Sequence, residues 1–185
     1  MKRIDAIRQI VKHLNDELVI CNLGFPCQEL YSVKDSPTHF YMLGSIGLAS
    51  SIGLGLSIAV RRKVVIIDGD GSLLYNLGSL MTVAMQRPEN LYWIVLDNES
   101  HGSTGFQPTY DATVANLGKL AQAAGLTKIQ VINNKSEFEE ALQQLKETGP
   151  LFLIVKIEEG NAKVSPIPVT PDLIKSRFIE EAKKG

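Results

Sequence analysis

The residues best suited to chemistry are a carboxylate within a Gly-Asp-Gly-Ser run and an amide further along the chain. Asp70 follows the apolar run 64–67 and lies between two glycines, and Asn98 ends a second apolar run. If these runs are neighbouring parallel strands joined by a helix, both side chains reach the carboxyl edge of one sheet. Carboxylate and amide oxygens suit a divalent cation, and a helix starting at Ser72 would point N–H groups at a bound phosphate. The spacing therefore predicts a site for a metal-bridged diphosphate.

A third metal ligand and a phosphate-binding loop are expected just after Asn98. The main-chain carbonyl of Ser100 would leave three octahedral positions for two phosphate oxygens and a water. Residues 98–105 are rich in small donors, and Glu99 is expected to turn away from the diphosphate. His101 is open to three interpretations: a contact with substrate, a contact with a cofactor, or a solvated loop histidine.

Short apolar runs alternate with helical patterns along the whole chain. Because each run is continuously apolar, the strands should be buried on both faces of a parallel sheet. The pattern predicts one α/β domain over residues 1–185, a three-layer parallel sheet with helices on both faces. The expected strands are 18–21, 40–43, 64–68, 91–97, 129–132 and 151–155. The expected helices are 3–15, 26–33, 46–60, 72–87 (in more than one piece), 113–124, 137–147 (capped by Ser136) and 171–183. Residues 98–111 are expected to be a loop without apolar periodicity, and 158–170 a surface excursion.

The composition gives no sign of a nucleic-acid-binding, membrane-spanning or disulfide-rich protein. With 19 basic and 20 acidic residues the net charge is −1, which gives no general attraction to nucleic acid or to anionic membranes. Cys21 and Cys27 are too few for a disulfide framework and fit no usual zinc or iron–sulfur spacing, so a cytoplasmic location is expected. The stretch 42–60 is weakly polar but full of glycine and serine, which favours a buried helix over a membrane span. The charged, amphipathic start of the chain is unlike a signal peptide.

Three segments resemble one enzyme family. Gly69-Asp70-Gly71 together with Asn98 resembles the thiamine-diphosphate motif of the decarboxylase and acetolactate-synthase superfamily. Gly44-Ser45-Ile46-Gly47 is similar to the segment just upstream of that motif. Residues 103–109 resemble a loop of phosphonopyruvate and sulfopyruvate decarboxylases. The resemblance implies the diphosphate-binding domain of these enzymes, with thiamine diphosphate and Mg²⁺ as cofactors.

The resemblance also implies roles for individual residues. Asp70, Asn98 and the Ser100 carbonyl would hold the magnesium ion. The Gly44 carbonyl would accept from the aminopyrimidine amino group, and Ile46 would wedge beneath the cofactor and bend it. Further cofactor contacts are implied for Gly24, Phe25, Ser45, Gly69, Gly71, Ser72, His101 and Gly102.

The resemblance points to half of an enzyme, most similar to the β subunit of the archaeal-type sulfopyruvate decarboxylases. Such a chain would convert sulfopyruvate to sulfoacetaldehyde and CO₂, on the route to coenzyme M. A separate α subunit would bring the pyrimidine-binding domain and a catalytic glutamate, so activity is expected only in a hetero-oligomer. Alone, the chain could form a homodimer. Phe106 stands where phosphonopyruvate enzymes tend to have glycine, and no arginine stands near Gln28, which leaves the acidic substrate open.

Other functions remain open at this point. One is a half-enzyme acting on phosphonopyruvate or another 2-oxo acid, and another is a non-catalytic module that binds thiamine diphosphate. A third is a dinucleotide-binding domain. Gly53-Leu54-Gly55 is a fragment of the G-x-G-x-x-G fingerprint, with Ile58 where the third glycine belongs.

Overall fold

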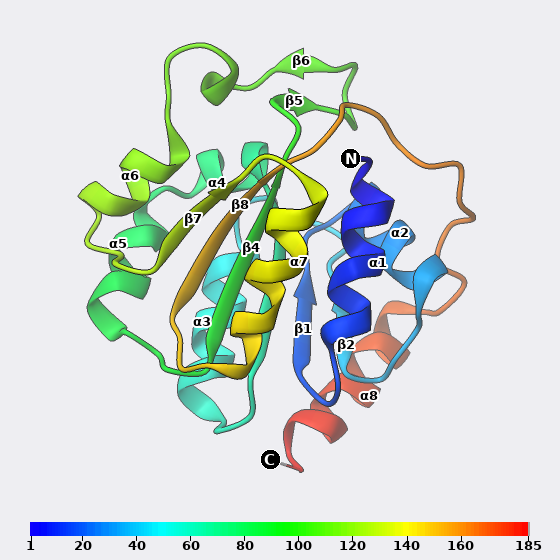
Figure 1. Ribbon diagram of the computed structural model, residues 1–185. Coiled ribbons are helices and arrows are strands. Elements are labelled where there is room, and N and C mark those ends of the chain that lie inside the picture. The colour runs from blue at the N-terminus through cyan, green and yellow to red at the C-terminus, as the bar shows by residue number, and fades with distance from the viewer. Residues whose placement is uncertain (185) are drawn as a thin grey trace.

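A single parallel sheet organises the computed structural model, which describes residues 1–184 (Figure 1). Its six strands occur in the order β2-β1-β3-β4-β8-β7 and all pair in parallel. They are β1 (Leu18–Cys21), β2 (His39–Tyr41), β3 (Val64–Gly69), β4 (Leu91–Asp97), β7 (Ile129–Ile132) and β8 (Leu151–Lys156). The central strands β1, β3, β4 and β8 are buried almost throughout, as their continuous apolar sequences predict.

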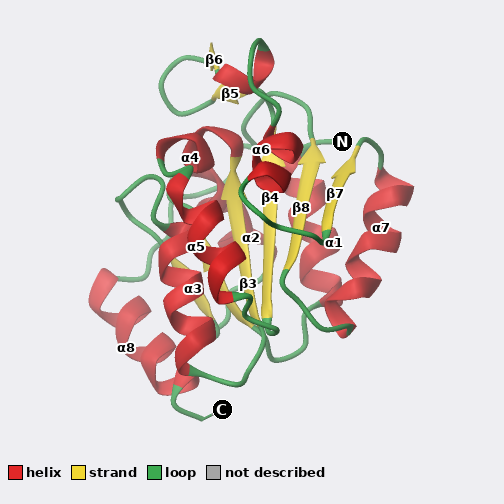
Figure 2. Ribbon diagram, turned by 90° about the vertical axis from the view of Figure 1, so that its left-hand side faces the viewer, coloured by secondary structure: helices red, strands yellow, loops and turns green. Residues whose placement is uncertain are grey.

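Helices cover both faces of this sheet, so the predicted three-layer α/β fold is confirmed (Figure 2). One face carries α1 (Arg3–His13), α2 (Phe25–Val33) and α7 (Lys135–Gln143), which is followed by the 3₁₀ turn η2 (Gln144–Lys146). The other face carries α3 (Ala49–Ala59), α4 (Asp70–Tyr75), α5 (Gly78–Gln86) and α6 (Leu117–Ala123). The last helix, α8 (Pro171–Ala182), packs along the edge strand β2, where Phe178 meets Phe40 with ring centroids 5.3 Å apart. This helix therefore covers an edge that would otherwise be open.

Helix α3 lies unusually close to the sheet because of one glycine. A Cβ atom at Gly53 would stand 2.4 Å from Cγ1 of Ile66 in β3. Gly53 and Gly55 lie within the helix and not in a turn between a strand and a helix. They therefore form no phosphate-binding turn, and the dinucleotide-binding interpretation of this segment is wrong.

Several helix boundaries differ from the predicted ones. Helix α3 begins at Ala49, three residues later than expected, because Ser45 and Gly47 adopt left-handed backbone angles (φ 63° and 86°). Helix α6 begins at Leu117, where the Asn116 side chain accepts a hydrogen bond from a backbone N–H, and not at residue 113. The cap of α7 is Asn134, whose side chain accepts from the Glu137 N–H at 3.0 Å, so the predicted Ser136 cap is wrong.

The segment after β4 is more ordered than the expected plain loop. Ser100–His101 (β5) pairs antiparallel with Gln107–Pro108 (β6), and the 3₁₀ turn η1 (Tyr110–Ala112) follows. This small hairpin stands above the carboxyl ends of the parallel strands (Figure 1). Within the described residues, no helix is both long and apolar enough to cross a membrane.

Candidate functional site

The sheet brings the two predicted metal-ligating side chains together. Strands β3 and β4 are neighbours, with Gly69 paired to Leu96 at their carboxyl ends. Asp70 begins α4 directly after β3, and Asn98 follows β4 by one residue. Both side chains therefore leave the same edge of the sheet.

The three groups predicted to ligate the metal converge at this edge. The outer atom of the Asn98 amide lies 3.2 Å from Asp70 Oδ1 and 2.9 Å from the Ser100 carbonyl oxygen. With the amide nitrogen at that position, the amide donates to both oxygens. With the amide oxygen there, it lies at 2.9 Å and 3.2 Å from the other two oxygens. Both distances are close to an edge of a magnesium octahedron, which is about 2.9 Å for Mg–O bonds of about 2.0–2.1 Å. The predicted ligand set thus fits a magnesium ion in both chemistry and spacing.

Thr109 fixes the direction of the Asp70 carboxylate. Its buried hydroxyl lies 2.8 Å from Asp70 Oδ2 and 2.6 Å from Asp111 Oδ1. One hydroxyl carries a single proton, so it can fully satisfy only one of these two carboxylates at a time. Because Oδ2 is held by Thr109, Oδ1 is the atom left facing Asn98.

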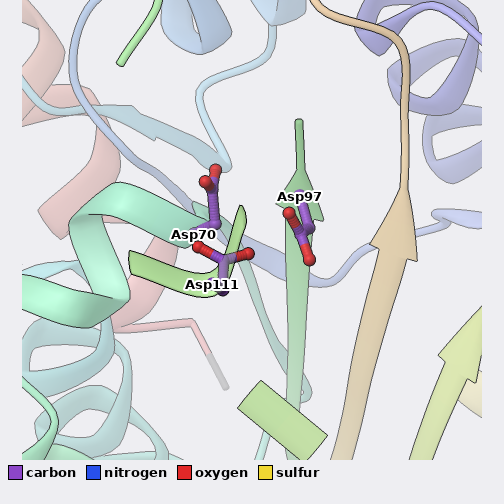
Figure 3. Close-up of side chains that lie close together, drawn as sticks. All are labelled: Asp70, Asp97 and Asp111. Carbon is purple, nitrogen blue, oxygen red and sulfur yellow. The ribbon is translucent and has the colours of Figure 1, made fainter. Parts of the chain in front are cut away.

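Three acidic side chains from different elements, Asp70 among them, lie close together at this edge (Figure 3). One carboxylate oxygen each from Asp70, Asp97 and Asp111 lies within 4.8 Å of the other two. Burial raises the pKa of Asp70 to about 6 and the pKa of Asp97 to about 7. Lys156 Nζ lies 2.7 Å from Asp97 Oδ2 and opposes the rise at Asp97. Three buried carboxyl groups beside a single lysine leave an excess of negative charge that a divalent cation would neutralise.

Most of the predicted cofactor contacts line one cleft at this edge. They are Phe25, Ile46, Gly69, Asp70, Gly71, Ser72, Asn98, Ser100, His101 and Gly102. Gly24, Gly44 and Ser45 do not line it. Gly44 and Ser45 instead border a neighbouring apolar pocket together with Leu43 and Ile52. The cleft is also lined by residues that were not predicted as cofactor contacts, among them Arg3, Asp68, Leu96, Ser103 and Asn161.

The helix that begins at Asp70 is packed closely against the hairpin. A Cβ atom at Gly71 would lie 2.7 Å from the His101 ring, so glycine is needed for this approach. The same ring packs edge-on against Tyr75, with centroids 6.2 Å apart. Ser72 Oγ accepts a hydrogen bond from the Gly47 N–H at 3.1 Å, which joins the cleft to the turn before α3.

Two buried polar atoms in the cleft lack a hydrogen-bond partner among the described residues. They are Ser100 Oγ and Asn22 Oδ1, and both residues line the cleft. Buried polar atoms are nearly always paired, so these atoms indicate a polar ligand. Together with the three converging oxygens, they fit a magnesium-bound diphosphate.

The predicted orientation of Glu99 is confirmed. Its carboxylate lies 2.5 Å from Lys156 Nζ, and Glu99 does not line the cleft. Asp68 is fully buried at the floor of the cleft, where burial raises its pKa to about 6 despite hydrogen bonds from Ser72, Gly69 and Trp93. Asp97 and Asp111 were missed as site residues. For Asp97, its position directly before Asn98 at the end of a strand was an available signal.

Several known proteins resemble this chain over most of its length. Residues 22–155 match the family described as thiamine pyrophosphate enzyme, C-terminal TPP binding domain. The chain is 50% identical over 183 residues to the sulfopyruvate decarboxylase subunit beta of Methanothermobacter thermautotrophicus, covering 99% of this chain and 96% of that one. It is 41% identical over 181 residues to the sulfopyruvate decarboxylase of Methanosarcina acetivorans, covering 97% of this chain but 47% of the longer protein.

Similarity to a solved structure supports the fold, and only the fold. The X-ray structure described as that of a thiamin diphosphate-dependent enzyme from Mycobacterium smegmatis matches with a TM-score of 0.68 at 21% identity. The match covers 86% of this chain and 32% of that chain. Residues 22–155 match the family, and relatives are similar along nearly the whole chain. The chain therefore belongs to the thiamine pyrophosphate enzymes and contains their C-terminal TPP-binding domain.

Proposed function

We propose that this chain is the β subunit of a sulfopyruvate decarboxylase that depends on thiamine diphosphate and Mg²⁺. It would release CO₂ from sulfopyruvate and form sulfoacetaldehyde, a step toward coenzyme M, with residues 1–185 as one diphosphate-binding domain. The observation that carries the proposal is the convergence of Asp70 Oδ1, the Asn98 amide and the Ser100 carbonyl at one sheet edge. The full-length similarity to a protein named as this subunit supports the substrate.

Each part of the site has a proposed role. Asp70, Asn98 and the Ser100 carbonyl would coordinate Mg²⁺, and Gly71 and Ser72 would contact the diphosphate. Ile46 lines the cleft and is 44% exposed, as expected of an apolar side chain that packs against a bound cofactor. Further contacts are proposed for Gly24, Phe25, Gly44, Ser45, Gly69, His101 and Gly102.

The chemistry of decarboxylation sets what this site has to do. Loss of CO₂ leaves an electron pair on the former carbonyl carbon, and thiamine diphosphate supplies the electron sink for that pair when it is bound. The chain's carboxylate and amide ligands would offset the diphosphate charge through the cation. Apolar residues at the cleft, such as Leu23, Ile46 and Leu96, would limit water at the reacting end.

An α subunit would complete this site. No glutamate lines the cleft among the described residues, so the glutamate that protonates the aminopyrimidine has to come from elsewhere. The matched relative from Methanosarcina acetivorans is about twice as long, which leaves room for a second domain in one chain. Tyr75 (67%), which packs against His101, and Leu43 (65%), which borders the neighbouring apolar pocket, are exposed, as expected of a surface that a partner covers. Two buried free cysteines support a cytoplasmic location.

The test is aldehyde release from sulfopyruvate with this chain, its α subunit, or both, in the presence of thiamine diphosphate and Mg²⁺. Turnover is expected only from the mixture. Full activity of this chain alone would refute the division into two subunits. Faster turnover of phosphonopyruvate in the same assay would assign the alternative substrate. Cofactor binding without turnover of any 2-oxo acid would indicate a non-catalytic module.

A further inference from the structure

A polar network joins the beginning of α1 to the loop that carries the metal ligands. Arg3 Nε and Nη2 donate to the two carboxylate oxygens of Glu29, each at 2.9 Å. Arg3 Nη2 also donates to Asn161 Oδ1 at 2.7 Å, and Asn161 Nδ2 donates to the Gly102 carbonyl at 2.9 Å. The chain of contacts therefore ends on the residue that follows Ser100 and His101.

This network is buried and comes from segments far apart in the sequence. Glu29 is 0% exposed and Arg3 is 8% exposed, and Glu29 Oε1 also accepts from the Ala162 N–H at 2.9 Å. The N-terminus and the first part of the segment after β8 lie toward the same edge of the molecule as β5 and β6 (Figure 1). The α-amino group of Met1 pairs with Glu158 at 3.1 Å and strengthens this junction. Because a buried ion pair adds little stability by itself, a structural role alone explains this arrangement poorly.

The strand pairing within the loop is short, and the His101 ring also packs against Gly71 and Tyr75. The β5–β6 pairing spans only two residues on each strand, and Ser103, Thr104 and Gly105 beyond it are exposed. A Cβ atom at Gly102 would lie 3.2 Å from Asn161 Oδ1, so the Asn161 side chain packs directly against this point of the loop. Asn161 is thus one of the contacts that hold the loop, and it acts at Gly102.

Arg3 and Asn161 also form a boundary between two spaces. Both line the cofactor cleft, and both line a second cavity of about 730 Å³ that is bordered by α1, α2 and residues 158–164. Among the described residues that line the cleft, Arg3 is the one lysine or arginine. Its charge is already paired with Glu29, so its main contribution is to orient Asn161.

We propose that Arg3 and Asn161, held by Glu29, are positioning residues that keep the loop 98–105 in its binding conformation before a cofactor arrives. This proposal rests on the proposed function for the identity of the ligand, the diphosphate of thiamine diphosphate. A loop that is already ordered loses little conformational entropy on binding, so holding the loop in place increases the affinity for the cofactor. The turnover of the loaded enzyme does not depend on it.

The first measurement requires no cofactor. Hydrogen exchange of the backbone amides of residues 99–106 is compared between the full-length wild-type chain and Asn161→Ala. Exchange in this segment should be at least about 10-fold faster in the variant, with the amides of β3 and α3 unchanged. Asn161→Asp keeps the acceptor for Arg3 but loses the donor to Gly102, so it should reproduce the effect. Lys163→Ala, an exposed position two residues away, is the matched control.

The second measurement is the affinity for thiamine diphosphate at saturating Mg²⁺, by calorimetry on the complex with the α subunit. Asn161→Ala should weaken it about 10-fold, as is common when a supporting contact is lost, with kcat at saturating cofactor within about twofold of wild type. Unchanged exchange in 99–106 or unchanged affinity would overturn the proposal. If the wild-type complex binds no thiamine diphosphate, the proposed function fails, and the exchange rates still decide whether Asn161 holds the loop.

Discussion

Replacing Thr109 by valine tests how the Asp70 carboxylate, the proposed metal ligand, is oriented. The change preserves the shape of a side chain that is 2% exposed and removes a hydroxyl 2.8 Å from Asp70 Oδ2 and 2.6 Å from Asp111 Oδ1. A hydrogen bond to a charged group contributes about 1.5–3 kcal/mol. At about 1.4 kcal/mol per factor of ten, this corresponds to roughly 10- to 150-fold in an equilibrium constant. We therefore expect Mg²⁺-dependent binding of thiamine diphosphate to weaken by about 10- to 100-fold.

Calorimetric titration of thiamine diphosphate at fixed Mg²⁺, repeated as a Mg²⁺ titration at fixed cofactor, measures this effect. Thr109→Ser is the matched control, because it keeps the hydroxyl and loses one methyl group. The serine variant should bind within a few-fold of wild type. Equal affinities of folded Thr109→Val and Thr109→Ser would refute the claim that this hydroxyl directs Asp70 Oδ1 at the cation.

Three other substitutions and one pH dependence follow from the structure. Asp70→Ala should abolish Mg²⁺-dependent cofactor binding in calorimetry without lowering the melting temperature, because the buried carboxylate it removes has a raised pKa. Ile46→Ala should retain binding and reduce kcat in the complex, since Ile46 is proposed to bend the cofactor. Gly53→Ala should reduce the free energy of unfolding in urea by about 1–3 kcal/mol through overpacking against β3. Burial lowers the pKa of His39 to about 4, so the unfolded chain binds the extra proton between pH 6.5 and 4. Stability should therefore fall by up to about 3 kcal/mol as the pH is lowered through this range, and denaturation of His39→Asn should lack that component.

The sheet, and the placement of Asp70 and Asn98 at one edge of it, could be predicted because their signals are local. Continuous apolar runs identify buried parallel strands, and Asp70 and Asn98 each stand at the end of one. The first residues of the helices were harder to predict from the sequence. Asn134 and Ser136 are both good capping residues, and the choice between them depends on where the chain leaves β7. The late start of α3 depends on left-handed angles at Ser45 and Gly47, which no hydrophobic pattern records.

The remainder of the site comes from segments that return to the cleft by tertiary folding. Thr109 and Asp111 reach Asp70 through a hairpin without apolar periodicity. Asn161 lies in the segment 158–170, whose composition predicts only a surface loop. Arg3 begins α1, whose sequence pattern is that of an ordinary amphipathic helix. Their importance depends on partners more than twenty residues away, and a single sequence carries no signal for such pairs.

The choice of an amide at position 98 has a consequence for the empty protein. While no ion is bound, the NH₂ group of the Asn98 amide can donate hydrogen bonds to the neighbouring oxygens. Rotation of the amide by a half-turn about its Cβ–Cγ bond then directs its oxygen at a cation. An aspartate at position 98 would bind a cation more strongly but would place a fourth carboxyl group beside Asp70, Asp97 and Asp111. While no cation is bound, the amide thus adds no further negative charge to the three carboxyl groups already gathered there.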